Sequence, residues 1–137
     1  MQDDFGLLQI KTPVVQIPDE NNSIYVKRDD LLPFSFGGNK VRIALEFIND
    51  MKNQGKDCIV GYGNARSNLS RALANLCYQF KIPCHIISPA DEDGTRIDTY
   101  NSKMVLSCDA KFHYCKKTNV KETVEKVLKN LREEGLS

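Results

Sequence analysis

Lys40, which directly follows the run Gly37-Gly38-Asn39, is a candidate nucleophile in this sequence of 137 residues. A lysine amine attacks a carbonyl carbon and forms a Schiff base only after it has lost its proton. We expect Lys40 in the first turn of a helix, where the positive end of the helix dipole disfavours the charged ammonium. Taken by itself, however, a lysine at a helix start is more often a solvated surface residue. The neighbouring residues must decide between the two interpretations.

A second group of polar residues, Ser67-Asn68-Leu69-Ser70-Arg71, has the composition of a helix start that can bind an anion. Ser67 and Asn68 are both candidates for the N-cap, because their side-chain oxygens can accept hydrogen bonds from backbone N–H groups of the first turn. The remaining free N–H groups of residues 67–70 would attract a carboxylate. On these grounds Ser67 is equally a plain cap and a catalytic group, and for Asn68 capping and ligand binding are compatible.

The elements around Lys40 can be predicted from turn formers and apolar periodicity. Residues 14–17 and 23–28 are β-prone runs separated by a cluster of turn formers, which predicts two short strands. The helix that follows has apolar residues at helical spacing, namely Val41, Ala44, Leu45, Ile48 and Met51. Gly55 then stands where a left-handed residue would end this helix.

Strands and helices alternate in the rest of the chain. The expected order is a strand at 58–62, a helix beginning at Ser67 or Asn68, a strand at 84–88, a polar acidic loop at 89–95, a helix at 96–106, a strand at 111–114, and a last helix with Val120, Val124, Val127, Leu128 and Leu131 on one face. Such alternation indicates βαβ crossovers, a parallel sheet and helices on its faces. The predicted fold class is therefore α/β.

The composition argues against several classes of protein. With 19 basic and 18 acidic residues the formal charge is +1, so no broad electrostatic field favours nucleic acid. The five cysteines form no CxxC pair, which argues against a metal site and fits free thiols in a reducing compartment. The acidic N-terminus is unlike a secretory signal, and no apolar run is long enough to span a bilayer. We therefore expect a cytoplasmic protein without nucleic-acid or membrane partners.

Two histidines and two tyrosines could serve a site but have ordinary explanations. His85 and His113 each fall in an expected strand with no carboxylate beside them in sequence. A lone strand histidine is more often a satisfied core or edge residue than a ligand. Tyr62 and Tyr100 could stack near a cofactor, yet tyrosines in α/β domains are usually packing residues.

Three segments in a fixed order resemble the N-terminal signature of the fold type II pyridoxal-phosphate (PLP) enzymes. They are Lys27-Arg28-Asp29-Asp30-Leu31, Gly37-Gly38-Asn39-Lys40-Val41-Arg42 and Ser67-Asn68-Leu69-Ser70-Arg71, preceded by Thr12-Pro13. The resemblance is to the branch of D-cysteine desulfhydrase and 1-aminocyclopropane-1-carboxylate deaminase. It implies a tryptophan-synthase-beta-like fold in which residues 1–54 begin the large PLP domain and residues 55–137 form a small α/β domain.

The resemblance also implies a role for each candidate residue. Lys40 would be catalytic and would hold the cofactor, pyridoxal 5'-phosphate, as a Schiff base. Asn68 would bind the cofactor through a hydrogen bond to its phenolic oxygen. Ser67 would be catalytic, or would bind the substrate carboxylate together with Asn68 and Leu69. The implied activity is elimination or deamination of a small amino acid by a homo-oligomeric lyase or deaminase.

The sequence departs from the family pattern at two places, and it also lacks one feature of the family. Leu69 stands where the family has His or Gln and cannot form a side-chain hydrogen bond, which leaves substrate choice open. The loop of residues 61–66 is longer than the family's short turn and carries Arg66. No Gly-rich run for the PLP phosphate follows Lys40, so we expect a truncated chain that is inactive alone. The alternatives are a non-catalytic α/β module that binds an anion at Ser67, or one that dimerises through an exposed sheet edge.

Overall fold

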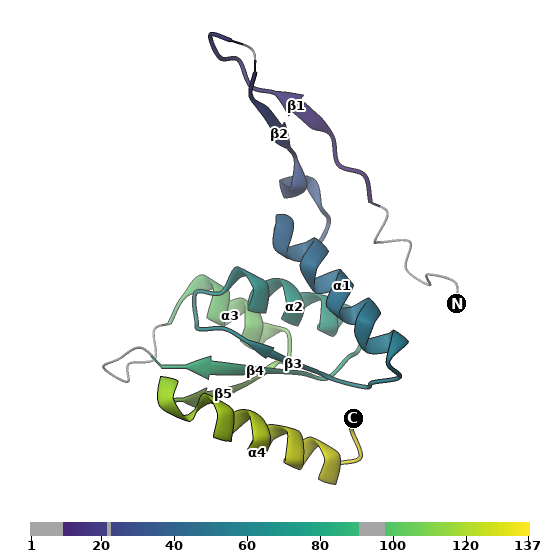
Figure 1. The fold of residues 1–137 in the computed structure, drawn as a ribbon, viewed down its shortest axis with the longest axis vertical. Helices are drawn as coiled ribbons and strands as arrows, with labels where there is room; N and C mark the ends of the chain where they lie inside the picture. The colour runs from purple at the N-terminus through teal and green to yellow at the C-terminus, as the bar shows by residue number, and fades with distance from the viewer. Residues whose placement is uncertain (1–9, 22, 91–97) are drawn as a thin grey trace.

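The computed structural model describes residues 10–21, 23–90 and 98–137. The acidic N-terminus and most of the loop expected at 89–95 lie outside the described residues. Figure 1 shows a long hairpin that projects from a body in which a sheet lies between helices. The body is therefore a layered α/β structure, as predicted.

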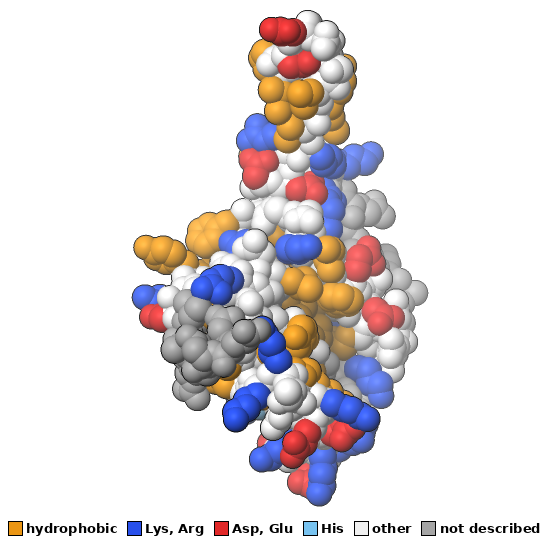
Figure 2. All heavy atoms as spheres, turned by 60° about the vertical axis from the view of Figure 1, so that its left-hand side comes forward, with side chains coloured by type: hydrophobic (Ala, Val, Ile, Leu, Met, Phe, Trp, Pro, Cys, Tyr) orange, Lys and Arg blue, Asp and Glu red, His pale blue; other side chains and the backbone are white. Residues whose placement is uncertain are grey.

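The projecting hairpin consists of β1 (Val14–Gln16) and β2 (Tyr25–Lys27), paired antiparallel. This confirms the predicted strand pair. Asp19 closes the turn, because its Oδ1 accepts a 2.9 Å hydrogen bond from the backbone N of Ser23. Apolar side chains are uncovered along the hairpin in Figure 2, and the exposed ones are Val14, Val15, Ile17, Ile24 and Tyr25. A patch of this kind is typical of a surface that contacts another part of a protein.

Helix α1 (Asn39–Asn53) carries Lys40 in its first turn, as predicted. Its predicted apolar face is buried, with Val41, Ala44, Leu45, Ile48 and Met51 in the core. Gly55 has a φ of +64°, so the chain leaves this helix through a left-handed residue. Because the buried face packs against the next helix and shares its core, the helix of Lys40 is fixed to the body.

The body contains a three-stranded parallel sheet in the order β3-β4-β5. Its elements are β3 (Ile59–Tyr62), α2 (Asn68–Gln79), β4 (Cys84–Pro89), α3 (Tyr100–Ser107), β5 (Lys111–Cys115) and α4 (Val120–Glu133). Figure 1 shows α4 on one face and α1, α2 and α3 on the other. Side chains alternate along β4, so that Ile86 lies in the core on the α2 side and Ile87 packs with Val127 and Leu131 of α4. The parallel sheet and its crossovers are thereby confirmed.

The start of α3 differs from the prediction. We expected a helix from residue 96, but it begins at Tyr100, and residues 96 and 97 lie outside the described residues. Thr99 is the N-cap: its hydroxyl accepts a 3.1 Å bond from Ser102 N, and Ser102 Oγ accepts a 2.9 Å bond from Thr99 N. This capping box fixes the helix start, because it satisfies N–H groups that would otherwise lack partners.

All five cysteines are free thiols, and those buried in the core are Cys77, Cys84 and Cys108. A hydrogen bond with Cys84, and then burial, raises the pKa of the Cys77 thiol. This thiol therefore stays protonated and behaves as a small apolar residue. In the described part of the chain, no helix combines the length and apolarity needed to cross a bilayer.

Candidate functional site

The loop that precedes Lys40 has an unusual backbone. Ser35, Phe36, Gly37 and Gly38 all have positive φ angles, of 49°, 62°, 68° and 92°. Left-handed backbone costs a non-glycine residue about 1–2 kcal/mol. Ser35 and Phe36 therefore hold strained conformations that surrounding contacts must maintain, and strain of this kind clusters at functional sites.

Gly37 is required because this loop packs directly on the 3-10 turn η2 (Asp29–Leu31). A Cβ at Gly37 would lie 2.8 Å from the carbonyl oxygen of Asp29 and still closer to that of Asp30. The backbone N of Gly38 donates a 2.6 Å hydrogen bond to the carbonyl oxygen of Asp29. The Asp-Asp-Leu turn therefore sets the position of the chain just before α1.

Asp29 also holds the helix that carries Lys40. Nε and Nη2 of Arg42 donate to the two carboxylate oxygens of Asp29 at 3.0 and 2.9 Å. Thr12 Oγ1 donates to Asp29 Oδ1 at 2.7 Å and accepts from Arg42 Nη2 at 3.1 Å. The hydrogen bonds from Arg42 and then Thr12 lower the pKa of Asp29 to about 2, so the carboxylate is ionised at neutral pH. This network joins the KRDDL and GGNKVR segments in the fold.

A ring contact joins the Lys40 loop to α2. The guanidinium carbon of Arg71 lies 5.5 Å from the centroid of the Phe36 ring, within the range of a cation–π contact. Lys40 itself is half-buried, and among the described residues no hydrogen bond joins it to Ser67 or Asn68. The SNLSR segment therefore contacts Phe36, the residue just before GGNKVR, through Arg71, and it does not contact the Lys40 side chain through a hydrogen bond.

The first turn of α2 presents the other predicted site residues, Ser67, Asn68 and Leu69. Ser67 is the N-cap, because its hydroxyl accepts a 3.1 Å bond from Ser70 N. Its carbonyl oxygen accepts a 3.2 Å bond from Arg71 N. The backbone N–H groups of Asn68 and Leu69 have no partner among the described residues. They are the open donors of this helix start, and such donors can bind an anion.

The loop between β3 and α2 closes tightly over this turn. Gly63 is buried, and a Cβ there would lie 2.7 Å from Ser67 Oγ and still closer to Ser70 Oγ, so a larger residue does not fit. Ser70 Oγ is buried and has no hydrogen-bond partner. An unpaired buried hydroxyl costs folding free energy. We interpret it as a feature of a site that a bound group would complete.

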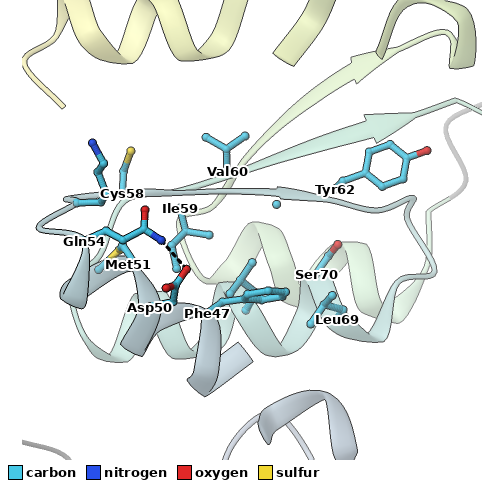
Figure 3. Close-up of a pocket in the computed structure, with 13 residues that line it drawn as sticks. Phe47, Asp50, Met51, Gln54, Cys58, Ile59, Val60, Tyr62, Leu69 and Ser70 are labelled. Atoms are coloured by element: carbon cyan, nitrogen blue, oxygen red, sulfur yellow. Dashed lines mark hydrogen bonds between the residues drawn. The ribbon is translucent and has the colours of Figure 1, made fainter. Parts of the chain in front are cut away.

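A pocket of about 410 Å³ lies next to this turn but does not enclose Lys40. Figure 3 shows it between α1 and strand β3, with Leu69 and Ser70 at the end that α2 forms. Lys40, Ser67 and Asn68 are absent from its lining. The predicted site residues therefore do not share this pocket, and Leu69 is the member of the set that reaches it.

Helix α3 contributes a residue that sequence reasoning missed. Nδ2 of Asn101 donates to the carbonyl oxygen of Arg66 at 2.8 Å and to Asn68 Oδ1 at 3.0 Å. Thr99 Oγ1 donates to the carbonyl oxygen of Ala65. The start of α3 therefore holds the loop that leads into α2. The available sequence signal was the Thr-x-x-Ser spacing at this helix start, which is a variant of the capping box.

The two histidines lie on the opposite face of the sheet, the face that α4 covers, and they contact each other. His85 Nδ1 and His113 Nε2 are 2.9 Å apart and share one hydrogen bond. Burial lowers the pKa of His85, as do His113 and Lys111, whereas Glu134 acts in the opposite direction. Burial and then Lys111 lower the pKa of His113. The two histidines thus satisfy each other's hydrogen bonding, in agreement with their interpretation as satisfied core or edge residues.

The two tyrosines differ from expectation. Tyr62 and Tyr100 are 60% and 89% exposed, so their interpretation as packing residues is wrong. Each stands close in sequence to the candidate site, Tyr62 at the end of β3 and Tyr100 at the start of α3.

Known proteins are similar to this chain in sequence and in fold. The D-cysteine desulfhydrase of Yersinia enterocolitica is 42% identical over 98 residues, which are 63% of this chain and 29% of that protein. That of Klebsiella pneumoniae is 32% identical over 101 residues, 70% of this chain and 30% of that protein. The chain spans roughly a quarter to a third of the length of the curated relatives it matches.

Two solved structures show the same fold. A homologue of ACC deaminase superimposes with a TM-score of 0.76 at 22% identity, covering 96% of this chain and 41% of that one. A hydrogen sulfide-producing enzyme from Fusobacterium nucleatum gives 0.64 at 21% identity, covering 90% and 42%. The family described as "Pyridoxal-phosphate dependent enzyme" matches residues 6–136. The match covers nearly all of the sequence, and the chain therefore belongs to the pyridoxal-phosphate dependent enzyme family.

Proposed function

We propose that this chain binds PLP and provides the lysine, the ring-binding amide and the carboxylate-binding helix start of a PLP-dependent lyase. Its family and its similarity to D-cysteine desulfhydrases support the proposal. When bound, PLP withdraws electrons from the substrate's α-carbon, so that a bond to this carbon can break. The residues present fit such a group: Lys40 is a half-buried amine, Asn68 an exposed amide, and Ser70 an unpaired buried hydroxyl.

Lys40 at the start of α1 and the residues at the start of α2 each have a separate task in this proposal. Lys40 is the residue that would hold the cofactor, and its amine could move a proton at the substrate. Asn68 Nδ2 would donate to the phenolic oxygen of the ring. Ser67 Oγ accepts from Ser70 N, so its own hydrogen is available to the substrate. The backbone N–H groups of Asn68 and Leu69 hold the substrate carboxylate.

The observation that carries the proposal is that direct contacts join the first two signature segments to each other, and join the loop just before Gly37 to the third. Asp29 pairs with Arg42, and the Arg71 guanidinium lies over the Phe36 ring. These contacts support one site assembled from sequence positions far apart, which a solvated surface lysine would not require. The resemblance in sequence is thus accompanied by physical contacts in the fold.

The proposal can be tested by adding PLP to the chain and recording the visible spectrum before and after borohydride reduction. We expect a visible band that reduction removes, and a reduced cofactor bound to the Lys40 peptide in the mass spectrum. Lys40→Ala should lack both, whereas Lys121→Ala, on an exposed face of α4, should keep both. No band for the wild type at millimolar PLP would contradict the proposal and favour the anion-binding alternative.

Substrate and turnover are proposed for the whole protein, because the chain spans only 26–30% of the length of these relatives. The relatives named D-cysteine desulfhydrase support elimination from a small amino acid, and the ACC deaminase homologue supports deamination. Leu69 offers an apolar side chain beside the carboxylate donors. We therefore propose a substrate with a small side chain, and no turnover by residues 1–137 alone.

The wider arrangement is also a proposal. Residues 1–54 would belong to a larger PLP domain and residues 55–137 to a small one. The uncovered apolar hairpin supports contact with the rest of that domain or with a second subunit of a homo-oligomer. Sedimentation of the whole protein would decide between a monomer and an oligomer. The free thiols support a reducing, cytoplasmic location.

A further inference from the structure

Asn101 contacts the candidate site from outside the signature segments. It lies in the first turn of α3, which the Thr99 and Ser102 capping box holds in place. Its carboxamide reaches across to the β3–α2 loop and to the Asn68 side chain. Asn101 is half-buried and Asn68 is exposed, so Asn68 is accessible to a ligand while its neighbour is fixed.

The chemistry of these atoms determines the direction of each hydrogen bond. The carbonyl oxygen of Arg66 can only accept, so the Asn101 atom 2.8 Å from it must be the nitrogen. That nitrogen has a second hydrogen, and the Asn68 atom 3.0 Å away must therefore be the acceptor, Oδ1. The Asn68 amide is thereby oriented, because its two ends are chemically different. Its Nδ2, with both hydrogens, faces away from Asn101.

We propose that Asn101 is a positioning residue, which fixes the Asn68 carboxamide with its donor end toward the cofactor. The inference rests on the proposed function, because the phenolic oxygen of PLP is an acceptor that Asn68 Nδ2 would serve. Without Asn101, the Asn68 amide could turn over and present its oxygen, which would repel the ring oxygen. The carbonyl oxygen of Arg66 can only accept a hydrogen bond, so it fixes the orientation of the Asn101 amide and, through it, that of the Asn68 amide.

The orientation can be measured without any ligand by NMR of the side-chain amide groups in 15N-labelled chain. Asn101→Asp keeps the size of the side chain but removes the donor, and Asn101→Ala removes it without adding charge. Ser107→Ala is the matched control, because exposed Ser107 Oγ donates to the carbonyl oxygen of Met104 at the other end of α3, away from the capping box and from Asn68. We expect both Asn101 variants to move the Asn68 Nδ2 signals and Ser107→Ala to leave them unchanged. Unmoved signals in a folded Asn101 variant would overturn the proposal.

A titration with PLP, followed by visible absorption, tests the consequence for binding. Loss of one oriented hydrogen bond should weaken PLP binding about tenfold in the Asn101 variants and shift the visible band. Ser107→Ala should bind as the wild type does. Equal affinity and an unshifted band in Asn101→Asp would overturn the inference while leaving the proposed function intact. If the wild type itself binds no PLP, the proposed function fails, and the NMR comparison still decides whether Asn101 orients Asn68.

Discussion

Replacing Gly37 by alanine should destabilise the chain far more than the same change at another left-handed glycine. Gly37 and Gly55 have nearly equal φ angles, +68° and +64°, but a Cβ at Gly55 meets nothing within 4 Å. The backbone strain of about 1–2 kcal/mol is therefore common to both variants, as is the gain from a stiffer unfolded chain, about 0.4–1 kcal/mol. The difference between them isolates the contact with the Asp29 and Asp30 carbonyls.

That contact should add about 2 kcal/mol, because a Cβ 2.8 Å from one carbonyl oxygen and closer to another cannot be accommodated without moving the loop. We expect a loss of about 1 kcal/mol in the free energy of unfolding for Gly55→Ala and about 3 kcal/mol for Gly37→Ala. Urea denaturation followed by circular dichroism measures both values. A difference below about 0.5 kcal/mol would show that the loop before Lys40 is not held against η2.

Two pH-dependent effects should be separable by urea denaturation at several pH values. The pKa values of His85 and His113 are lowered in the folded chain, so their stabilising contribution is present above the unfolded value of about 6.5 and is lost as the pH falls below it. The double variant His85→Phe/His113→Phe should abolish that loss of stability. An unchanged pH profile of stability in this variant would contradict the prediction. The pKa of Asp29 is lowered to about 2, so its contribution is lost only between the unfolded value of about 3.9 and about 2. Asn in place of Asp29 should reduce stability at pH 7 and remove most of that acid-dependent loss, whereas wild-type stability at pH 7 would contradict the role of the Arg42 network.

Local periodicity was sufficient to predict most of the elements. The spacing of Val41, Ala44 and Leu45 identifies the buried face of α1 because a helix buries every third or fourth residue. The parallel sheet could likewise be predicted, because strands that alternate with helices need crossover connections. The start of α3 was missed because its boundary depends on the capping box of Thr99 and Ser102, which competes with the less regular apolar pattern before it.

The contacts that build the candidate site could not be read from periodicity. Asp29 and Arg42 lie in different elements, and only packing of the loop on η2 brings them together. Asn101 is one of many polar residues in the sequence, and its contact with Asn68 depends on how α3 meets the β3–α2 loop. The resemblance to a known signature supplied Lys40, Ser67 and Asn68 as candidates, and their roles stay predictions.

Asp29 anchors the chain on both sides of Lys40, since its carbonyl oxygen binds Gly38 and its carboxylate binds Arg42. The intervening backbone is thus a short tether with both ends attached to one residue. An amine preorganised in this way loses less conformational freedom when it reacts than one on a free chain. Because one end of the tether is an ion pair that is partly exposed to solvent, high ionic strength should loosen Lys40 before the helix itself unfolds.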